Sequence, residues 1–218
     1  MIVLGLDTAL GACSAALTRD GEALAALGEP MLRGHQERLA TLVQEVVQAS
    51  RVPFAAIDRV GVTVGPGSFT GLRVGLAFAK GLGLALGKPC VGVGTLEALA
   101  ASAPGQGLTA AVIDAKRGQV YVQAFEGGAA LMAPDALDIG TAAARLAELW
   151  RDGPLRLIGP GAALLAGISP EAEVIERAAP EPAAICLLAA AKASSAGARP
   201  LYLRAPDAKL PGGRDLPA

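Results

Sequence analysis

A glycine-rich turn followed by a helix with one unusually small side constrains this chain most. Residues 65–71 read Gly-Pro-Gly-Ser-Phe-Thr-Gly, and the apolar run that follows, 72–86, predicts a helix. Small residues recur every four positions along one side of it: Gly71, Gly75, Ala79, Gly83 and Gly87. Because a glycine inside a helix costs about 1 kcal/mol relative to alanine, such a stripe indicates that another backbone packs closely there.

The other side of this predicted helix carries large apolar residues: Val74, Phe78, Leu82 and Leu86. A helix that is apolar nearly all round has to be covered on more than one side. Its own sheet supplies one cover, and the second is either the rest of the same chain or another polypeptide. A membrane span is not expected, because Arg73 and Lys80 interrupt a run shorter than the roughly 20 residues that a span needs.

Composition limits the classes of function open to the chain. With 218 residues, a formal net charge of −1 and 3% aromatic residues, it lacks the basic surface and stacking side chains that favour direct nucleic-acid binding. Cys13, Cys90 and Cys186 lie far apart without metal-ligand spacing, which indicates reduced thiols and a cytoplasmic location. The first residues lack the pattern of a signal peptide.

Each half of the chain is predicted to begin with strands, continue with a helix and then return to a strand. The expected strands are 2–8, 13–18, 23–27 and 60–64 in the first half, and 108–113 and 119–125 in the second. The expected helices are 36–48 and 141–150. Residues 155–161 then repeat the strand and Gly-Pro-Gly turn of residues 61–67.

This repeated order predicts a duplicated α/β protein with two lobes of the plan βββαβα. We place the first lobe at residues 1–103 and the second at 104–218. The last predicted helix, 183–196, is expected to cross back onto the first lobe, and the tail from about residue 206 is expected to be loose.

Two acidic turns are candidates for a nucleotide site. Asp7, followed by Thr8, ends the first strand of one half, and Asp114, close to Arg117 and Gly118, ends the first strand of the other. Duplicated two-lobed folds often hold a nucleotide between such turns. An aspartate at a turn can equally accept hydrogen bonds from neighbouring backbone amides, so both interpretations stay open.

The glycine turn is a second candidate. Gly65 and Gly67 let the backbone bend, and Ser68 or Thr70 could cap the helix or help to bind an anion at its start. Neither phosphate-binding motif is present, however. Leu72-Arg73 follows the last glycine where a mononucleotide loop needs Lys and then Ser or Thr, and no acid stands about 20 residues further on.

His35 is the single histidine of the chain. A site with two imidazoles is therefore excluded, and Leu39 stands where a second ligand on the same helical face would lie. Ser68 lacks the Gly-x-Ser-x-Gly spacing of a nucleophile. The residues thus predict a nucleotide-type fold without catalytic equipment of its own.

Six segments carry a resemblance to a known family: 1–8 (MIVLGLDT), 65–75 (GPGSFTGLRVG), 80–82 (KGL), 94–96 (GTL), 114–121 (DAKRGQVY) and 200–204 (PLYLR). They are spread over nearly the whole chain, and the GPGSFTGLR run is highly specific. The chain resembles the family that contains the tRNA threonylcarbamoyladenosine transferase TsaD, long labelled glycoprotease or M22 peptidase, and within it the non-catalytic TsaB proteins.

The resemblance implies a duplicated, two-lobed actin/Hsp70-like ATPase fold with ribonuclease-H-like lobes. Catalytic members hold a metal with a His-x-x-x-His pair, and this chain has His35 and Leu39 at the matching positions. It therefore implies a pseudo-enzyme with no metal and no intrinsic cofactor, and ATP bound at most weakly or at a shared interface. An active ATPase, kinase or metallopeptidase of the same fold is the alternative, and a nucleotide-binding module without partners is a third hypothesis.

The resemblance also implies partners. The chain is expected to form a heterodimer with TsaD and to help recruit TsaE, so that threonylcarbamoyl is transferred to adenosine next to the anticodon of ANN-decoding tRNAs. It would contact tRNA only indirectly and no membrane, and alone it could form an isologous homodimer.

We expect the partner surface on the helices 36–48 and 70–86. Its residues would be Leu39, Leu42, Val46, Gly71, Gly75, Phe78, Ala79, Leu82 and Gly83. On this hypothesis, Gly75→Leu or Gly83→Leu weakens the heterodimer by overpacking and leaves the monomer folded.

Overall fold

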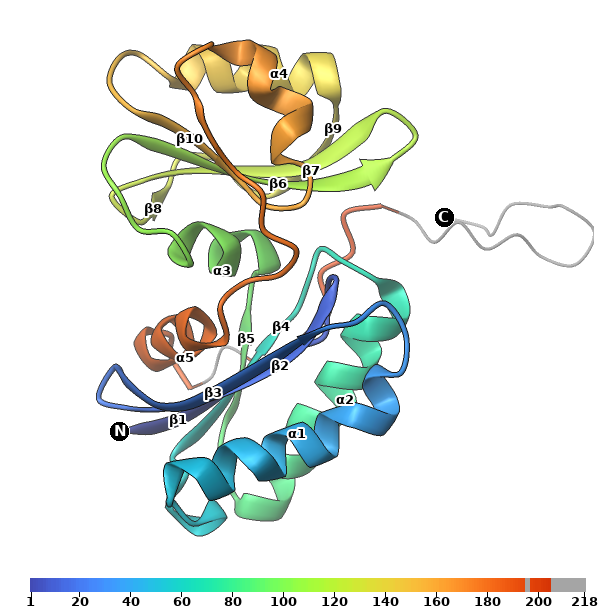
Figure 1. The fold of residues 1–218 in the computed structure, drawn as a ribbon, viewed down its shortest axis with the longest axis vertical. Helices are drawn as coiled ribbons and strands as arrows, with labels where there is room; N and C mark the ends of the chain where they lie inside the picture. The colour runs from blue at the N-terminus through green and yellow to red at the C-terminus, as the bar shows by residue number, and fades with distance from the viewer. Residues whose placement is uncertain (195–196, 205–218) are drawn as a thin grey trace, which may run out of the picture.

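The computed structural model describes residues 1–194 and 197–204. Figure 1 shows two lobes stacked end to end, each built on one β-sheet. Two helices, α3 (Thr95–Ala101) and α5 (Pro182–Ala191), lie between the sheets.

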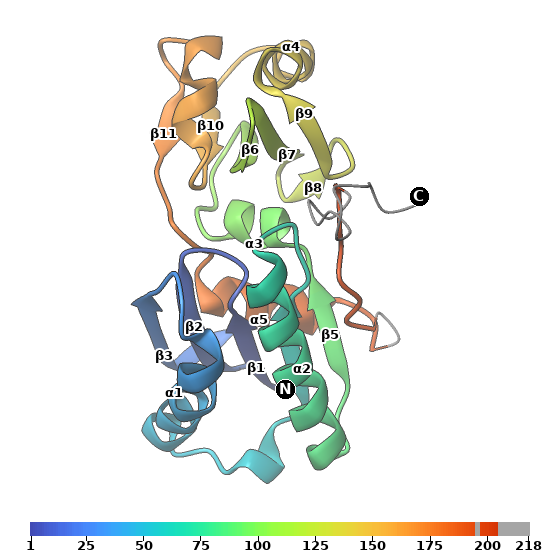
Figure 2. The same cartoon turned by 90° about the vertical axis from the view of Figure 1, so that its right-hand side faces the viewer.

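The first lobe has a five-stranded sheet in the order β3-β2-β1-β4-β5. Its strands are β1 (Ile2–Asp7), β2 (Ala12–Arg19), β3 (Glu22–Pro30), β4 (Arg59–Thr63) and β5 (Cys90–Val93). The first three strands pair antiparallel, whereas β1, β4 and β5 pair parallel. One face of this sheet packs against α1 (His35–Ser50) and α2 (Phe69–Leu86), and the short 3-10 turn η1 (Phe54–Ala56) precedes β4. Figure 2 shows both long helices on the side of the sheet opposite α5.

The second lobe repeats this plan with shorter elements. Its main sheet has the order β11-β10-β6-β7-β8, and a further strand, β9, pairs with β7. The strands are β6 (Leu108–Lys116), β7 (Gln119–Glu126), β8 (Ala129–Ala130), β9 (Asp135–Asp138), β10 (Leu155–Ile158) and β11 (Glu173–Ile175). Helix α4 (Ile139–Leu149) occupies the place of α1, and the 3-10 segment η2 (Ala162–Ile168) stands where α2 follows the Gly-Pro-Gly turn in the first lobe.

The predicted duplicated α/β architecture is confirmed by these two sheets. In both lobes an antiparallel pair of strands leads to a helix, and the strand after that helix pairs parallel with the first strand. The expected last helix is shorter than predicted, because α5 ends at Ala191 and the following backbone is extended at Lys192. The guanidinium of Arg59 donates to the carbonyls of Ala189 and Lys192, both at 2.5 Å, and so caps this helix end. The tail from residue 206 lies outside the described residues.

Helix α5 crosses back to pack against the sheet of the first lobe, in contact with β1, β2 and β4. Two glycines in the sheet make this approach possible. A Cβ added at Gly5 would lie 2.7 Å from Cys186 Sγ, and one added at Gly61 would lie 2.6 Å from Ala189 Cβ. The last helix therefore covers one face of the first sheet, while α1 and α2 cover the other.

An apolar cluster joins the two lobes. Leu96 and Leu99 of α3 pack with Ile113 and Ile158 of the second sheet, and Leu10, from the turn after β1, packs against the same cluster. The lobes are thus held together by buried side chains next to the two acidic turns.

The small stripe of α2 faces the interior of its own lobe. Gly71, Gly75, Ala79 and Gly83 are all buried. A Cβ added at Gly75 would lie 2.5 Å from Thr8 Oγ1, one added at Gly71 would collide with the Thr8 carbonyl, and one added at Gly83 would lie 3.0 Å from the Lys88 carbonyl. The close backbone approach inferred from the sequence is real, but the neighbour is this chain.

The prediction that these residues form a partner surface is therefore wrong for the small stripe. It is also wrong for Leu39, Leu42 and Val46, which are at most 1% exposed because the apolar side of α1 packs on the first sheet. Phe78 and Leu82 are partly buried against the same core, so they offer only part of their surface. By length and composition alone α2 could cross a membrane, but its small stripe packs against β1, β4 and β5.

We predict opposite effects for two alanine substitutions in α2. Gly75→Ala should lower the free energy of unfolding by about 1–3 kcal/mol, because its methyl group overlaps Thr8. Gly81→Ala should raise it by up to about 1 kcal/mol, because no atom lies within 4 Å of an added Cβ and alanine favours the helix. Chemical denaturation of both variants measures the difference. Equal effects of the two changes would contradict the inward orientation of the stripe. The same orientation means that Gly75→Leu should disrupt the monomer, because the larger side chain would overlap Thr8.

Candidate functional site

The groove between α1 and α2 is open to solvent on the outer side of the first lobe. A hollow of about 560 Å³ lies there. Its lining includes Leu39, Phe69, Arg73, Val74, Ala77 and Phe78. Phe69, Arg73 and Ala77 are exposed, and none of them belongs to the small stripe. The solvent-facing side of α2 is thus the side opposite the small stripe.

An aromatic and cationic stack borders this hollow. The guanidinium of Arg73 lies over the ring of Phe69, 3.8 Å from its centroid. The Phe69 ring in turn contacts Tyr202, with ring centroids 5.6 Å apart. Sequence reasoning missed this group because Tyr202 is far away in the chain, although the spacing of Phe69 and Arg73 on one helical turn was visible.

A second pocket, of about 380 Å³, lies where α1 and α2 begin. Ser68, Thr70 and Gly71 line it from α2, and His35 and Glu37 line it from α1. Ser68 accepts a hydrogen bond from the amide of Gly71 at 3.3 Å and so acts as the N-cap of α2. The predicted capping role of Ser68 is what the geometry supports, whereas Thr70 is exposed beside the cap.

The glycine turn serves to place the start of α2 against the rest of the lobe. Gly65 has φ +117°, and a Cβ there would lie 2.5 Å from the Leu201 carbonyl. Gly67 approaches the Ala9 carbonyl so closely that no Cβ fits, and the Ser68 amide donates to the same carbonyl at 2.8 Å. Gly65 and Gly67 are therefore required by contacts with this chain's own backbone.

Asp7 is fully buried at the end of β1. Its Oδ1 accepts hydrogen bonds from Thr63 Oγ1 at 2.6 Å and from the Ala9 amide at 3.1 Å, whereas Oδ2 has no partner in the described part of the chain. Burial raises the pKa of the Asp7 carboxyl to about 6, and the hydrogen bonds from Thr63 and Ala9 oppose this shift. Thr8, the next residue, donates to the Gly71 carbonyl at 2.8 Å and ties the same turn to α2.

Asp114 has a different environment. Its carboxylate accepts from the Lys116 amide at 2.8 Å and from Lys116 Nζ at 2.6 Å, and these contacts lower its pKa. Lys116, Arg117 and Gly118 all have positive φ, so they form a tight turn between β6 and β7. Among the described residues, Asp7 and Asp114 share no hydrogen-bond partner, and a nucleotide between the two acidic turns stays a prediction.

His35 is 8% exposed at the start of α1, and its Nε2 has no hydrogen-bond partner in the described ranges. Leu39, one turn later, is a core residue. Within residues 1–194 and 197–204, no group of three His, Cys, Asp or Glu side chains could hold a metal ion. The residues present thus do not fit the two-histidine metal site that the resemblance implies for catalytic members of the family.

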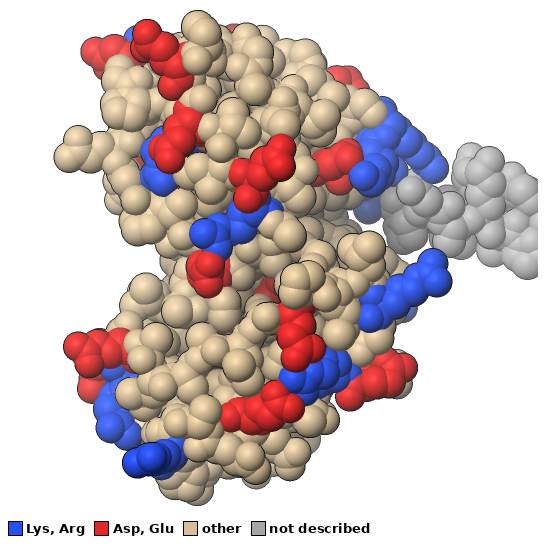
Figure 3. Space-filling model, in the orientation of Figure 1, with Lys and Arg blue, Asp and Glu red and all other residues tan. Residues whose placement is uncertain are grey.

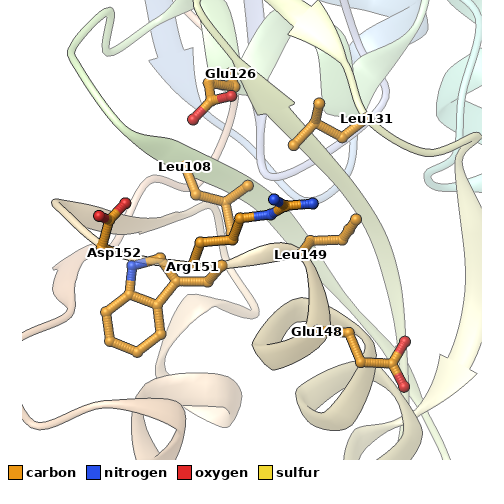
Figure 4. A pocket seen from close by; sticks show the side chains of 8 residues that line it. Leu108, Glu126, Leu131, Glu148, Leu149, Arg151 and Asp152 are labelled. Carbon is orange, nitrogen blue, oxygen red and sulfur yellow. The ribbon is translucent and has the colours of Figure 1, made fainter.

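The second lobe has a pocket of about 410 Å³ beside the end of α4. Figure 4 shows the side chain of Arg151 crossing it, with Glu126, Glu148 and Asp152 on separate sides. Trp150 is held at its edge by a hydrogen bond from Nε1 to the Gly153 carbonyl at 3.0 Å. Since the carboxylates do not converge, this pocket offers no pair of acids for catalysis.

Comparison with known proteins shows where this architecture belongs. The model of the family described as TsaD, tRNA N6-adenosine threonylcarbamoyltransferase, matches residues 29–155. The chain is 40% identical over 124 residues to the tRNA threonylcarbamoyladenosine biosynthesis protein TsaB of Escherichia coli K12. The chain belongs to the TsaD family, in its TsaB branch.

Two further matches cover almost the full length. The chain is 35% identical over 216 residues to the uncharacterized protein Rv3421c of Mycobacterium tuberculosis, covering 95% of this chain and 93% of that protein. The solved structure of YeaZ from Pseudomonas aeruginosa matches with a TM-score of 0.78 at 28% identity, covering 93% of this chain and 99% of that one. The actin-like ATPase fold expected from the sequence is thereby confirmed.

The match to E. coli TsaB covers 56% of this chain and 53% of that protein. The chain spans about half the length of the curated TsaB relatives that it matches. Because the match is partial, the pathway named for the TsaB relatives supports a proposal about this chain and does not establish its function.

We predict that Asp7 makes stability depend on pH with an unusual sign. Its carboxyl binds a proton more tightly in the folded chain than in the unfolded one, so the free energy of unfolding should fall as pH rises from about 4 to about 6 and then level off. Asp7→Asn should remove this fall. At pH 7.5 the variant should be more stable than the parent chain by up to about 3 kcal/mol, since each pKa unit corresponds to about 1.4 kcal/mol.

Denaturation curves between pH 4 and about 7.5 measure this effect. Asp114→Asn is the matched control, because the Asp114 carboxyl is partly exposed with a lowered pKa and its loss should leave the fall in place. Parallel curves for the parent chain and Asp7→Asn would show that the Asp7 carboxyl titrates normally.

Proposed function

We propose that this chain is a non-catalytic subunit of the machinery that makes threonylcarbamoyladenosine in tRNA, and that it binds TsaD through the outer side of α1 and α2. The observation that carries the proposal is the open hollow of about 560 Å³ beside exposed Phe69 and Arg73. The proteins named TsaB at 32–40% identity support the assignment to this pathway.

The hollow has the composition expected of a protein interface. Its apolar lining includes Val74, Ala77 and Phe78, and its border carries Phe69, which is 43% exposed. Aromatic residues and arginine are enriched at the centres of interfaces, where they carry much of the binding energy. A helix face that stays in contact with water is usually polar. The apolar and aromatic lining of the hollow therefore favours a second polypeptide bound over this side of α2.

The lack of a catalytic set supports the non-catalytic part of the proposal. In the part of the chain that the structure describes, the single histidine is buried without a metal-binding neighbour and the two aspartates lie in separate environments. Hydrolysis or phosphoryl transfer would need convergent acids, a metal or an activated nucleophile. We assign recruitment of TsaE to the assembled pair, and contact with tRNA to the partner subunits.

The charge distribution agrees with an indirect role toward tRNA. The net charge is −1, and in Figure 3 acidic and basic side chains both occur over the two lobes on the face drawn. Direct tRNA binding usually depends on a dense basic surface. We also propose a cytoplasmic location, as for a tRNA-modifying protein.

An active ATPase or kinase of the same fold is the second candidate. It is favoured by Asp7, whose pKa is raised to about 6, because strongly shifted carboxyls often occur at active sites. The purified chain with ATP and a divalent metal tests it. Turnover well above the blank that disappears in Asp7→Ala would establish the enzyme and overturn the subunit hypothesis.

We predict that Ala77→Gln weakens binding to TsaD about tenfold. Ala77 is exposed and lines the hollow, and an amide buried there without a partner costs about 1–3 kcal/mol. The change adds no charge, so it tests the place of the interface independently of electrostatics. Titration calorimetry with purified TsaD measures the dissociation constant.

Ala147→Gln is the matched control, since Ala147 is an exposed alanine in α4 of the second lobe. It should bind TsaD as the parent chain does. Equal affinities for all three proteins would move the interface away from α1 and α2.

A further inference from the structure

The exposed side of α2 is cationic and lacks acidic residues. Arg73, Ala77, Lys80 and Leu84 follow one another at helical spacing, and all four are exposed. The helix from Phe69 to Leu86 contains no Asp or Glu. Its two cations therefore have no intrahelical counter-charge.

The acids of the neighbouring elements are mostly engaged elsewhere. Glu29 of β3 and Glu45 of α1 both bind Arg38, at 2.6 and 2.7 Å. Glu37 lines the smaller pocket at the start of α1, in the first turn of its own helix, where the helix dipole favours a negative charge. Among the described residues, Arg73 takes part in no salt bridge.

Arg73 is nevertheless held in a defined position. Its guanidinium lies 3.8 Å from the centroid of the Phe69 ring, and the Phe69 ring in turn contacts Tyr202. A stacked guanidinium keeps its in-plane N–H donors available, and it loses less conformational entropy when a carboxylate binds. It also lies at the border of an apolar hollow, where a bound partner would exclude water and strengthen the ion pair.

We propose that Arg73 is the specificity-determining cation of the docking face and receives a carboxylate from the partner. The partner segment would present an Asp or Glu next to a large apolar side chain that fills the hollow. This inference rests on the proposed function, because it takes the α1–α2 side as the interface. A second copy of this chain fits less well, since its own α2 would bring Arg73 and Lys80 and no acid.

The test compares Arg73→Gln with Lys80→Gln in binding to TsaD at low and high salt. Both variants remove one exposed charge from the same helix, but only Arg73 lines the hollow and stacks on an aromatic ring. We expect Arg73→Gln to weaken binding about 30-fold at low salt and to lose most of the salt dependence. Lys80→Gln should change the dissociation constant by no more than about threefold.

Arg73→Lys separates charge from geometry. Lysine keeps the positive charge but lacks the planar fork and the stack, so its affinity should lie between those of the parent chain and Arg73→Gln. Because Arg73 is exposed, the melting temperatures of the variants should match that of the parent chain, which checks folding.

Three outcomes would overturn the inference. If Arg73→Gln binds like the parent chain while Ala77→Gln binds weakly, the docking face stands and the carboxylate contact is wrong. If both variants bind TsaD like the parent chain, the interface does not lie on the α1–α2 side, and the carboxylate contact fails with that part of the proposed function. If the chain alone sediments as a dimer that Arg73→Gln dissociates, the occupant of the hollow is a second copy.

Discussion

The backbone of residues 7–9 supports the beginning of α2, and the rest of the first lobe is arranged around this contact. Thr8 Oγ1 donates to the Gly71 carbonyl, and the Ser68 amide donates to the Ala9 carbonyl. A Cβ added at Gly67 would collide with the Ala9 carbonyl, and one added at Gly71 would collide with the Thr8 carbonyl. With its small side seated here, α2 can only turn its other side, including Phe69 and Arg73, toward solvent. The glycine turn thus determines which surface the protein can offer to a partner.

Much of the architecture could be predicted because it follows from local periodicity. The apolar spacing of Leu39, Leu42 and Val46 identified α1, and the two Gly-Pro-Gly turns revealed the duplication. The glycine spacing also predicted a close backbone neighbour correctly. The spacing could not identify this neighbour, because a second subunit and Thr8 would both require a residue as small as glycine at position 75. Only the position of β1 behind α2 distinguishes the two, and that contact links residues far apart in the chain.

The candidate site was harder to predict for the same physical reason. Sequence patterns favour buried residues, whereas an interface uses the exposed residues that patterns leave unassigned. In the sequence, Arg73 interrupts an apolar run. In the fold it stacks on Phe69, whose ring also contacts Tyr202 near the end of the described chain. The second lobe shows the contrast. Its Gly-Pro-Gly turn leads into a short 3-10 segment, so the described part of that lobe has no long helix in the position of α2.

Asp7 combines a feature that is common at active sites with contacts that serve the fold. Leu10 and α3 pack nearby in the apolar cluster that joins the lobes, and the Asp7 carboxyl accepts hydrogen bonds from Thr63 and Ala9. The unpaired Oδ2 and the raised pKa mean that this carboxylate is buried at a cost. The same turn also positions α2, because Thr8 Oγ1 donates to the Gly71 carbonyl and the Ala9 carbonyl accepts from the Ser68 amide.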